Sequence, residues 1–165
     1  RFNPQKNHPF LLDVFAALLK KEPDAVLLLV GGGADMPKIQ AKAQELGIAE
    51  RVRFLGVRSD VADLMQAMDV FVFPSLYEGL PVTMVEAQAS GLPCIISDKV
   101  PPECILTEGL VNIMPLSASP EAWAEKILAM RAIPRTDRHE EIAAHGFDIT
   151  TEAVKLQDFY LEASK

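Results

Sequence analysis

The feature that most constrains the fold of this chain is a series of short, largely apolar runs separated by stretches of helical pattern. Glycine, proline or aspartate bounds most of the runs, which lie at residues 25–30, 52–55, 70–73, 94–97 and 111–114. Strands that are apolar on both faces are typical of a parallel sheet whose crossover helices cover it on both sides. The pattern therefore predicts an α/β fold, a Rossmann-like three-layer sandwich with a mostly parallel sheet and helices on both faces.

The segments between these runs carry helix signals. Asn7 or His8 could cap a first helix, and Asp60 could cap another. Further helices are expected over residues 36–46, 60–68 and 81–90. After the last apolar run the pattern is helical to the end, with helices expected from Ser119, over 137–144, and from a Thr150 cap to about Ala163. A chain of 165 residues with this pattern and no long linker is expected to form one domain, residues 1–165.

Composition excludes several classes of function. The formal net charge is −7 and the basic residues form no patch, so we expect no nucleic-acid partner. The longest apolar runs are too short to span a membrane. Cys94 and Cys104 make no disulfide framework, and Cys94, which begins an apolar run, is interpreted as a buried, inert thiol. We expect a reducing, cytoplasmic compartment.

Two glutamates eight residues apart, Glu78 and Glu86, follow the run at 70–73. A helix is expected to open at Pro81 and to carry Glu86 on its second turn. The free backbone N–H groups and the dipole of a helix N-terminus favour anions such as phosphate, and carboxylates accept hydrogen bonds from hydroxyls. An anion site with two nearby carboxylates suits a nucleotide sugar.

The same sheet would bring further loops to this place. In open parallel sheets, ligands bind outside the carboxyl ends of the strands. The loops expected there are 31–35, 56–60, 74–80 and 97–103, and they concentrate the glycines and prolines of this part of the chain. Glycine allows a backbone to approach a ligand closely.

Several of these segments, in order along the chain, resemble the motifs of glycosyltransferase family 4, the group 1 glycosyltransferases. The resemblance rests mainly on residues 71–75, 78–81 and 86–93, and it extends to the basic segment 1–6, the glycine-rich turn 29–33, the strand 52–56 and the loop 96–98 with Glu103. The family has the GT-B architecture of two Rossmann-like domains. The resemblance implies that this chain is the C-terminal, donor-binding half, and that a first strand and an N-terminal domain belong before Arg1.

The resemblance also implies roles for individual residues. Arg1 and Lys6 would hold the diphosphate, Glu78 would contact the transferred sugar, and Glu86 would accept hydrogen bonds from the ribose diol. Other donor-binding positions would come from the helix start, the base loop and the glycine-rich turn. They are Gly79, Leu80, Val82, Thr83, Gly56, Val57, Arg58, Gly31 and Gly32. The triple glycine at 31–33 is equally explained as a tight turn between a strand and a helix.

The expected partners follow from the same resemblance. They are a nucleoside-diphosphate sugar (with UDP as the favoured nucleotide), a glycan or lipid-linked acceptor, and the N-terminal domain of the same protein. Family members retain the anomeric configuration and need no metal or other cofactor, and this chain has no Asp-x-Asp motif. We expect a cytoplasmic enzyme of capsular or exopolysaccharide synthesis, with peripheral association at the inner face of the membrane through the N-terminal domain. The 165 residues alone are expected to be inactive.

Two alternatives stay open. A UDP-sugar epimerase of the same architecture would carry a different histidine and glycine set, which the sequence does not show. A non-catalytic Rossmann-like module for NAD would carry Gly-x-Gly-x-x-Gly after a strand, with an acidic residue about 20 positions later. That pattern does not occur here.

Overall fold

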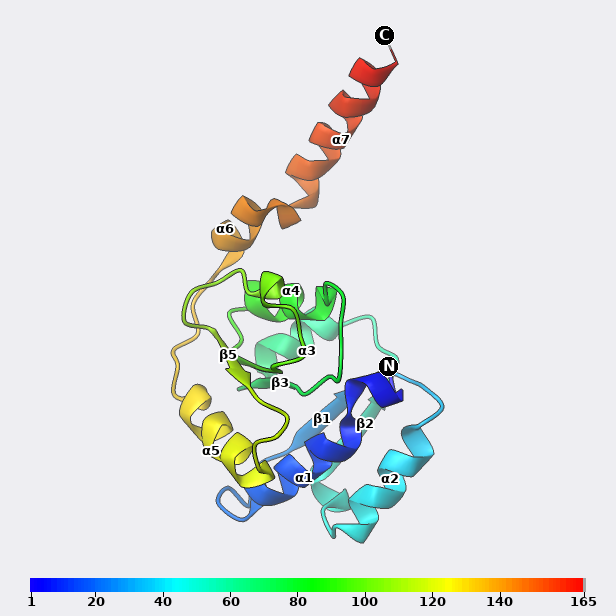
Figure 1. Ribbon diagram of the computed structural model, residues 1–165, viewed down its shortest axis with the longest axis vertical. Coiled ribbons are helices and arrows are strands. Elements are labelled where there is room, and N and C mark those ends of the chain that lie inside the picture. The colour runs from blue at the N-terminus through cyan, green and yellow to red at the C-terminus, as the bar shows by residue number, and fades with distance from the viewer. Residues whose placement is uncertain (165) are drawn as a thin grey trace.

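The computed structural model describes residues 1–164. Five strands run parallel in two separate ladders (Figure 1). In the first ladder β1 (Leu27–Val30) pairs with β2 (Val52–Gly56). In the second, β3 (Phe71–Phe73) pairs with β4 (Cys94–Ser97), which pairs with β5 (Val111–Met114). All five strands lie where the apolar runs predict them.

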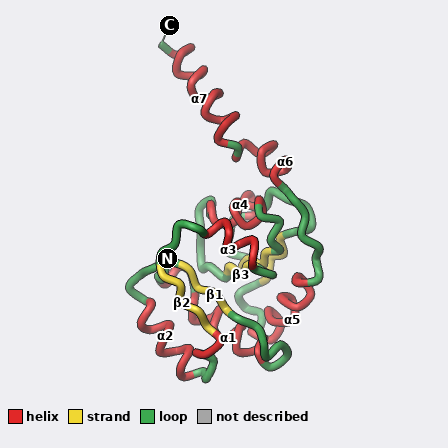
Figure 2. The backbone as a smooth tube through the Cα atoms, turned by 180° about the vertical axis from the view of Figure 1, so that it is seen from behind, coloured by secondary structure: helices red, strands yellow, loops and turns green. Residues whose placement is uncertain are grey.

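Helices surround both ladders and confirm the predicted α/β sandwich (Figures 1 and 2). The helices are α1 (His8–Leu19), α2 (Met36–Glu45), α3 (Val61–Ala67), α4 (Val82–Ala89), α5 (Pro120–Arg131), α6 (His139–Ile142) and α7 (Ile149–Ala163). Three 3₁₀ turns lie at Pro4–Lys6, Ala49–Arg51 and Pro102–Cys104. α1 packs against both α5 and α2, and α5 reaches β4, so α1 and α5 join the two ladders on one side.

The hydrophobic core consists of two clusters of buried residues. One cluster surrounds Leu12, Leu29 and Trp123, and the other surrounds Met84 and Ile96. The strands are parallel throughout, as the sequence pattern predicts, and among residues 1–164 they form two separate ladders. β1 and β3 face each other across a cavity instead of pairing, because no strand of these residues lies between them.

Two helix starts differ from the prediction. Asn7 occupies the cap position of α1, but its side chain makes no capping bond and its φ is 52°. The cap of α7 is Asp148 rather than Thr150, since the Asp148 carboxylate accepts from the Thr150 N–H. Ser119 caps α5 as predicted, accepting from the backbone N–H of Ala122.

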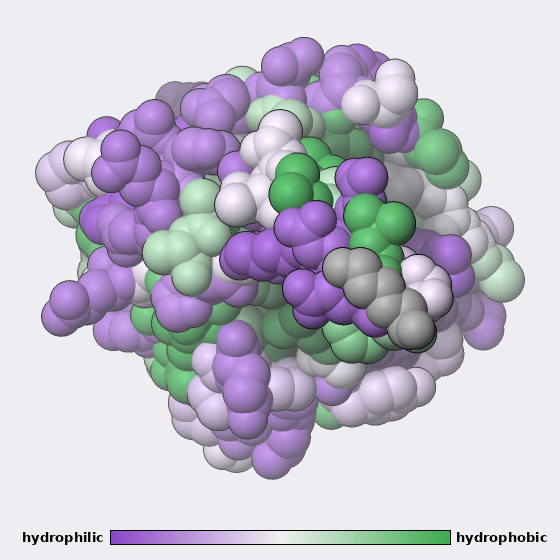
Figure 3. Space-filling model, turned by 90° about the horizontal axis from the view of Figure 1, so that it is seen from above, coloured by the Kyte–Doolittle hydropathy of each residue, from purple (hydrophilic) through white to green (hydrophobic). Residues whose placement is uncertain are grey.

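The end of the chain extends away from the body. The helix expected over 137–144 is shorter, and a π-helical turn at Ala143–Phe147 follows α6, with Gly146 at φ 82°. α7 then projects from the rest of the molecule (Figure 1). Its apolar side chains are exposed among polar ones (Figure 3). They are Ile149, Val154, Leu156, Phe159, Tyr160 and Leu161.

Two further features concern the cysteines and the apolar character of the helices. Cys94 is free and buried, as predicted, and the structure buries Cys104 as well; burial raises the pKa of both thiols. Over residues 1–164, no helix combines the length and the apolar character that a membrane crossing requires.

Candidate functional site

The carboxyl ends of β1 and β3 meet the N-terminal segment of the chain, and Lys6 marks that junction. The Lys6 ammonium lies 2.7 Å from the Glu78 carboxylate and 4.5 Å from the centre of the Phe73 ring. The Glu78 side chain is only 8 % exposed, and that of Lys6 is 24 % exposed. A nearly buried carboxylate needs such a partner, so this ion pair fixes both groups at the end of β3.

Backbone contacts hold the same two segments together. The backbone N–H of Leu76 donates to the carbonyl of Gln5 at 2.8 Å. The Gln5 side-chain amide donates to the carbonyl of Tyr77 at 2.9 Å. The loop that carries Glu78 is therefore tied to the Pro4–Lys6 turn along its length, and the position of Glu78 depends on residues more than seventy positions earlier.

α4 begins at this loop and turns its N-terminus toward the same place. Pro81 is the cap residue and offers no capping side chain, so the first N–H groups of the helix remain available. Thr83 and Glu86 line the cavity that begins here. Glu86 lies on the second turn, as predicted, and is exposed. The predicted residues Gly79, Leu80 and Val82 are also exposed, but they lie outside the cavity lining.

Arg1 lies over the glycine-rich turn after β1. The Phe2 N–H donates to the carbonyl of Gly32 at 3.0 Å, and the Phe2 carbonyl accepts from Asp35. A Cβ on Gly33 would lie 2.2 Å from the Phe2 carbonyl oxygen, so only glycine fits. The third glycine therefore has a packing role in seating the N-terminal segment. Gly31 and Arg1 line the cavity beside it.

The loop after β2 supplies the opposite wall. Val57 and Arg58 line the cavity, while Gly56 has φ 66° at the end of the strand. The Arg58 guanidinium donates to both carboxylate oxygens of Asp60, at 2.7 and 2.5 Å. These hydrogen bonds raise the pKa of Arg58 and lower the pKa of Asp60. Asp60 is thus engaged with Arg58 rather than acting as a side-chain cap for α3.

His8 is a cavity residue to which the sequence patterns assign no firm role. Its ring stacks on Phe2 with centroids 4.6 Å apart, and its Nδ1 is buried without a hydrogen-bond partner among residues 1–164. Burial lowers the pKa of His8 to about 4, and the positive charges of the Arg1 amine and Lys6 act in the same direction. The imidazole is therefore neutral near pH 7. Its place two residues after Lys6 is the only sequence signal for it.

The loop after β4 contributes structure instead of cavity wall. The Ser97 hydroxyl donates to the carbonyl of Ser75 at 2.5 Å. The Asp98 carboxylate accepts from the N–H of Leu116 and so faces the end of β5. Glu103 is exposed on the Pro102–Cys104 turn and is not part of the cavity lining.

One cavity of about 760 Å³ unites the lining residues named above and continues between the two ladders. Its mouth carries two cationic side chains, a hydroxyl and a carboxylate, which belong to Lys6, Arg1, Thr83 and Glu86. Within residues 1–164, no three histidine, cysteine, aspartate or glutamate side chains are grouped so that they could hold a metal ion. The mouth is suited to an anionic ligand with hydroxyl groups.

Comparison with known proteins agrees with this chemistry. The family model described as glycosyl transferases group 1 matches residues 1–132. The chain is 41 % identical to EpsF of Bacillus subtilis (strain 168) over 163 residues, which are 97 % of this chain and 42 % of EpsF. It is 29 % identical to the Escherichia coli UDP-Gal:alpha-D-GlcNAc-diphosphoundecaprenol alpha-1,3-galactosyltransferase over 98 % of this chain and 44 % of that enzyme.

Solved structures show the same fold. Anabaena HepE in complex with UDP-glucose superposes with a TM-score of 0.76 at 25 % identity, over 98 % of this chain and 47 % of HepE. The chain thus spans less than half the length of the relatives it matches. The match to the family model over residues 1–132, together with the fold shared with GT-B glycosyltransferases, shows that the chain belongs to the group 1 glycosyltransferases.

Proposed function

We propose that this chain is the C-terminal, donor-binding half of a retaining glycosyltransferase of family 4. The donor is a UDP-sugar, and the acceptor is a glycan or a lipid-linked glycan of a capsular or exopolysaccharide pathway. The observation that carries the proposal is the Lys6–Glu78 ion pair beside the uncapped N-terminus of α4, at a cavity that Glu86 also lines.

The proposed roles follow from charge and position. The Lys6 ammonium and the Arg1 guanidinium neutralise the diphosphate. The backbone N–H groups of Val82 and Thr83, at the N-terminus of α4, donate hydrogen bonds to its phosphate oxygens. As the sugar leaves, negative charge builds on the diphosphate, and these fixed positive groups stabilise it more in the transition state than in the ground state. Glu78, held by Lys6, accepts from hydroxyls of the transferred sugar.

The other donor contacts belong to the nucleoside. Glu86 accepts hydrogen bonds from the two ribose hydroxyls, and the loop Gly56–Arg58 lies against the base. Two further backbone segments lie against the phosphates of the donor. They are Gly31 with Gly32, and Gly79 with Leu80. Transfer in this scheme uses no metal, and activity that persists in excess EDTA and does not rise with added Mg²⁺ tests that part.

Support for the substrate class comes from the relatives. The Escherichia coli relative is named as an enzyme that uses UDP-Gal and acts on a diphosphoundecaprenol-linked sugar. HepE was solved with UDP-glucose bound. The remaining half of the enzyme would supply the acceptor site and the membrane contact, so the 165 residues alone should bind donor without turnover.

Isothermal titration of the chain with UDP, GDP, ADP and NAD tests the proposal. We expect UDP to bind most tightly, and Glu86→Gln to weaken UDP about tenfold, since a hydrogen bond to a charged group contributes about 1.5–3 kcal/mol. Glu45→Gln is the matched control, because Glu45 is an exposed helix carboxylate outside the cavity lining. Tight binding of NAD alone, or equal UDP affinity in the Glu86 and Glu45 variants, would refute the assignment.

A further inference from the structure

The loop between β3 and α4 carries Glu78, yet it packs little of its own surface against the body of the molecule. The side chains of Leu76, Tyr77 and Leu80 are exposed, and a Cβ on Gly79 would have no atom within 4 Å. A loop that buries so little apolar surface keeps one position only where hydrogen bonds hold it. The hydrogen bonds of this loop therefore decide where the Glu78 carboxylate lies.

Three hydrogen bonds connect residues 76–79 to distant parts of residues 1–164, and all three involve Gln5 or Lys6. The Lys6 ammonium donates to Oε1 of Glu78, and the Gln5 carbonyl accepts from the Leu76 N–H. The Gln5 side-chain amide donates to the carbonyl of Tyr77 at 2.9 Å, directly before Glu78. Within the described part of the chain, no other hydrogen bond reaches the backbone of residues 77–79.

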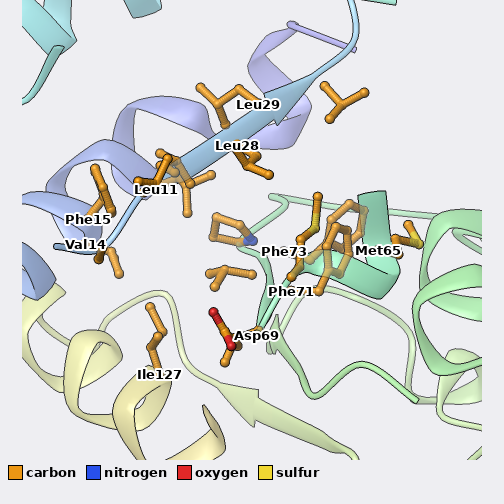
Figure 4. Close-up of a pocket in the computed structure, with 18 of the residues that line it drawn as sticks. Leu11, Val14, Phe15, Leu28, Leu29, Met65, Asp69, Phe71, Phe73 and Ile127 are labelled. Atoms are coloured by element: carbon orange, nitrogen blue, oxygen red, sulfur yellow. The ribbon is translucent and has the colours of Figure 1, made fainter. Parts of the chain in front are cut away.

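The two side-chain anchors respond differently to a bound anion. Lys6 reaches Glu78 beside the ring of Phe73, which lines the cavity at the end of β3 (Figure 4). A diphosphate at the cavity mouth brings further negative charge to the same ammonium, so the attraction between Lys6 and Glu78 weakens when a donor is bound. The hydrogen bond from Gln5 to Tyr77 joins two neutral groups, and an added charge alters it much less.

Gln5 is itself held in place by its neighbours. It is the middle residue of the Pro4–Lys6 turn, and the Asn3 side chain caps that turn by accepting from the backbone N–H of its last residue. Phe2, just before the turn, is buried. A hydrogen bond donated from such a fixed turn gives the exposed loop a fixed point at Tyr77.

We propose that Gln5 is a positioning residue for recognition of the transferred sugar. Its side-chain amide holds the Tyr77–Glu78 peptide, so that Glu78 stays aimed at the sugar while Lys6 is engaged with the diphosphate. This inference rests on the proposed donor site and on Glu78 as the residue that meets the sugar. Oε1 of Glu78 accepts from Lys6, whereas Oε2 accepts from no group among residues 1–164 and remains for a sugar hydroxyl. Gln5 lies outside the cavity lining, so its effect on the donor runs through Glu78.

Isothermal titration calorimetry with UDP, UDP-glucose and UDP-galactose tests this proposal. Gln5→Met removes the amide at similar volume and without a change of charge, and Gln5→Asn keeps an amide that is one methylene too short to reach Tyr77. Gln44→Met is the matched control, since Gln44 is exposed on α2 outside the cavity lining. Both Gln5 variants should weaken the better-bound UDP-sugar about five- to tenfold and change UDP affinity by less than about twofold, and the control should change neither.

A double-mutant cycle tests whether Gln5 acts through Glu78. In a Glu78→Ala background, Gln5→Met should cause no further loss of UDP-sugar affinity, because the carboxylate that it positions is gone. The melting temperature of the single Gln5 variants should stay within about 2 °C of that of the original chain, since the hydrogen bond lies near the surface.

Several results would overturn the proposal. They are equal weakening of UDP and UDP-sugar, unchanged UDP-sugar affinity in both Gln5 variants, and a further loss in the Glu78→Ala background. A large fall in melting temperature would assign Gln5 to the stability of the whole fold and would also overturn it.

Failure of the donor site gives a different result. An original chain that binds neither UDP nor a UDP-sugar refutes the donor site, and this proposal with it. UDP-sugar affinity that is unchanged in Glu78→Ala removes the sugar role of Glu78 and again this proposal. UDP-sugar affinity that depends on Glu78 but not on Gln5 refutes the role of Gln5 alone.

Discussion

Replacing Gln88 with alanine tests what holds the loop after β4 against the helix that carries Glu86. Gln88 lies on α4 and is fully buried. Its side-chain amide donates to the carbonyls of Met84 and Cys104, at 2.9 and 2.7 Å. Its side-chain carbonyl accepts from the backbone N–H groups of Leu106 and Thr107 and from the Thr107 hydroxyl. A single side chain thus satisfies polar groups from two segments.

The cost follows from the groups left behind. The Met84 carbonyl belongs to the α4 ladder and loses little. Cys104 and Thr107 are buried, so their polar groups keep no partner, and the half-buried Leu106 N–H regains water in part. At about 1–3 kcal/mol for each unsatisfied buried group, with the cavity added, Gln88→Ala should cost about 3–5 kcal/mol. For a chain of this length the melting temperature should fall by roughly 10 °C.

Urea denaturation followed by circular dichroism measures this loss. Gln88→Met separates hydrogen bonding from packing, because it keeps most of the volume and removes the amide. The Gln88→Met variant should lose nearly as much stability as the Gln88→Ala variant does. Gln44→Ala, on the exposed face of α2, should change stability by less than about 0.5 kcal/mol. A loss below about 1 kcal/mol for Gln88→Ala, or full stability in Gln88→Met, would refute the reasoning.

Three further perturbations address the site and its supports. The pKa of His8 is about 4 in the folded chain, below its ordinary 6.5, so stability should fall as pH drops from 6.5 to 4 and then level off. After allowance for solvent screening, the free energy of unfolding should fall by about 2 kcal/mol over this range. Urea titrations in which His8→Gln shows the same pH dependence of stability as the original chain would contradict this. Lys6→Gln should weaken UDP binding about tenfold in calorimetry and also lower the melting temperature, since Glu78 loses its partner. Gly91→Ala should destabilise the chain by more than 2 kcal/mol in thermal unfolding, because a Cβ there would lie 2.1 Å from the Thr136 carbonyl; an unchanged melting temperature would exclude that contact.

Much of the candidate site is readable from local pattern. The runs at 70–73 and 94–97 are continuous and apolar, and they form β3 and β4 within one residue of the prediction. Pro81 marks the start of α4, which places Glu86 on its second turn. These features depend on a few neighbouring residues, and local chemistry is enough to predict them.

Contacts between distant segments could not be predicted in this way. The Lys6–Glu78 pair joins residues 72 positions apart, and the role of Gly33 depends on Phe2 lying across it. The sequence pattern predicts Thr150 as the cap of α7, yet Asp148 takes that place, because two neighbouring capping residues compete and the backbone geometry selects one. His8 lines the cavity and its ring stacks on Phe2. No rule of residue spacing predicts this contact.

The sequence by itself determined the order of strands and helices, the parallel class of the sheet and the presence of two carboxylates beside a helix start. These follow from the period of the apolar pattern and from turn residues, which act over a few positions. Only the tertiary structure decided that the sheet is open between β1 and β3, and that Lys6 neutralises Glu78 at the end of that opening. The physical reason is that strand pairing and charge neutralisation depend on contacts between residues far apart in the sequence, which form only when the chain closes long loops. A local sequence pattern carries no information on which distant residues come into contact.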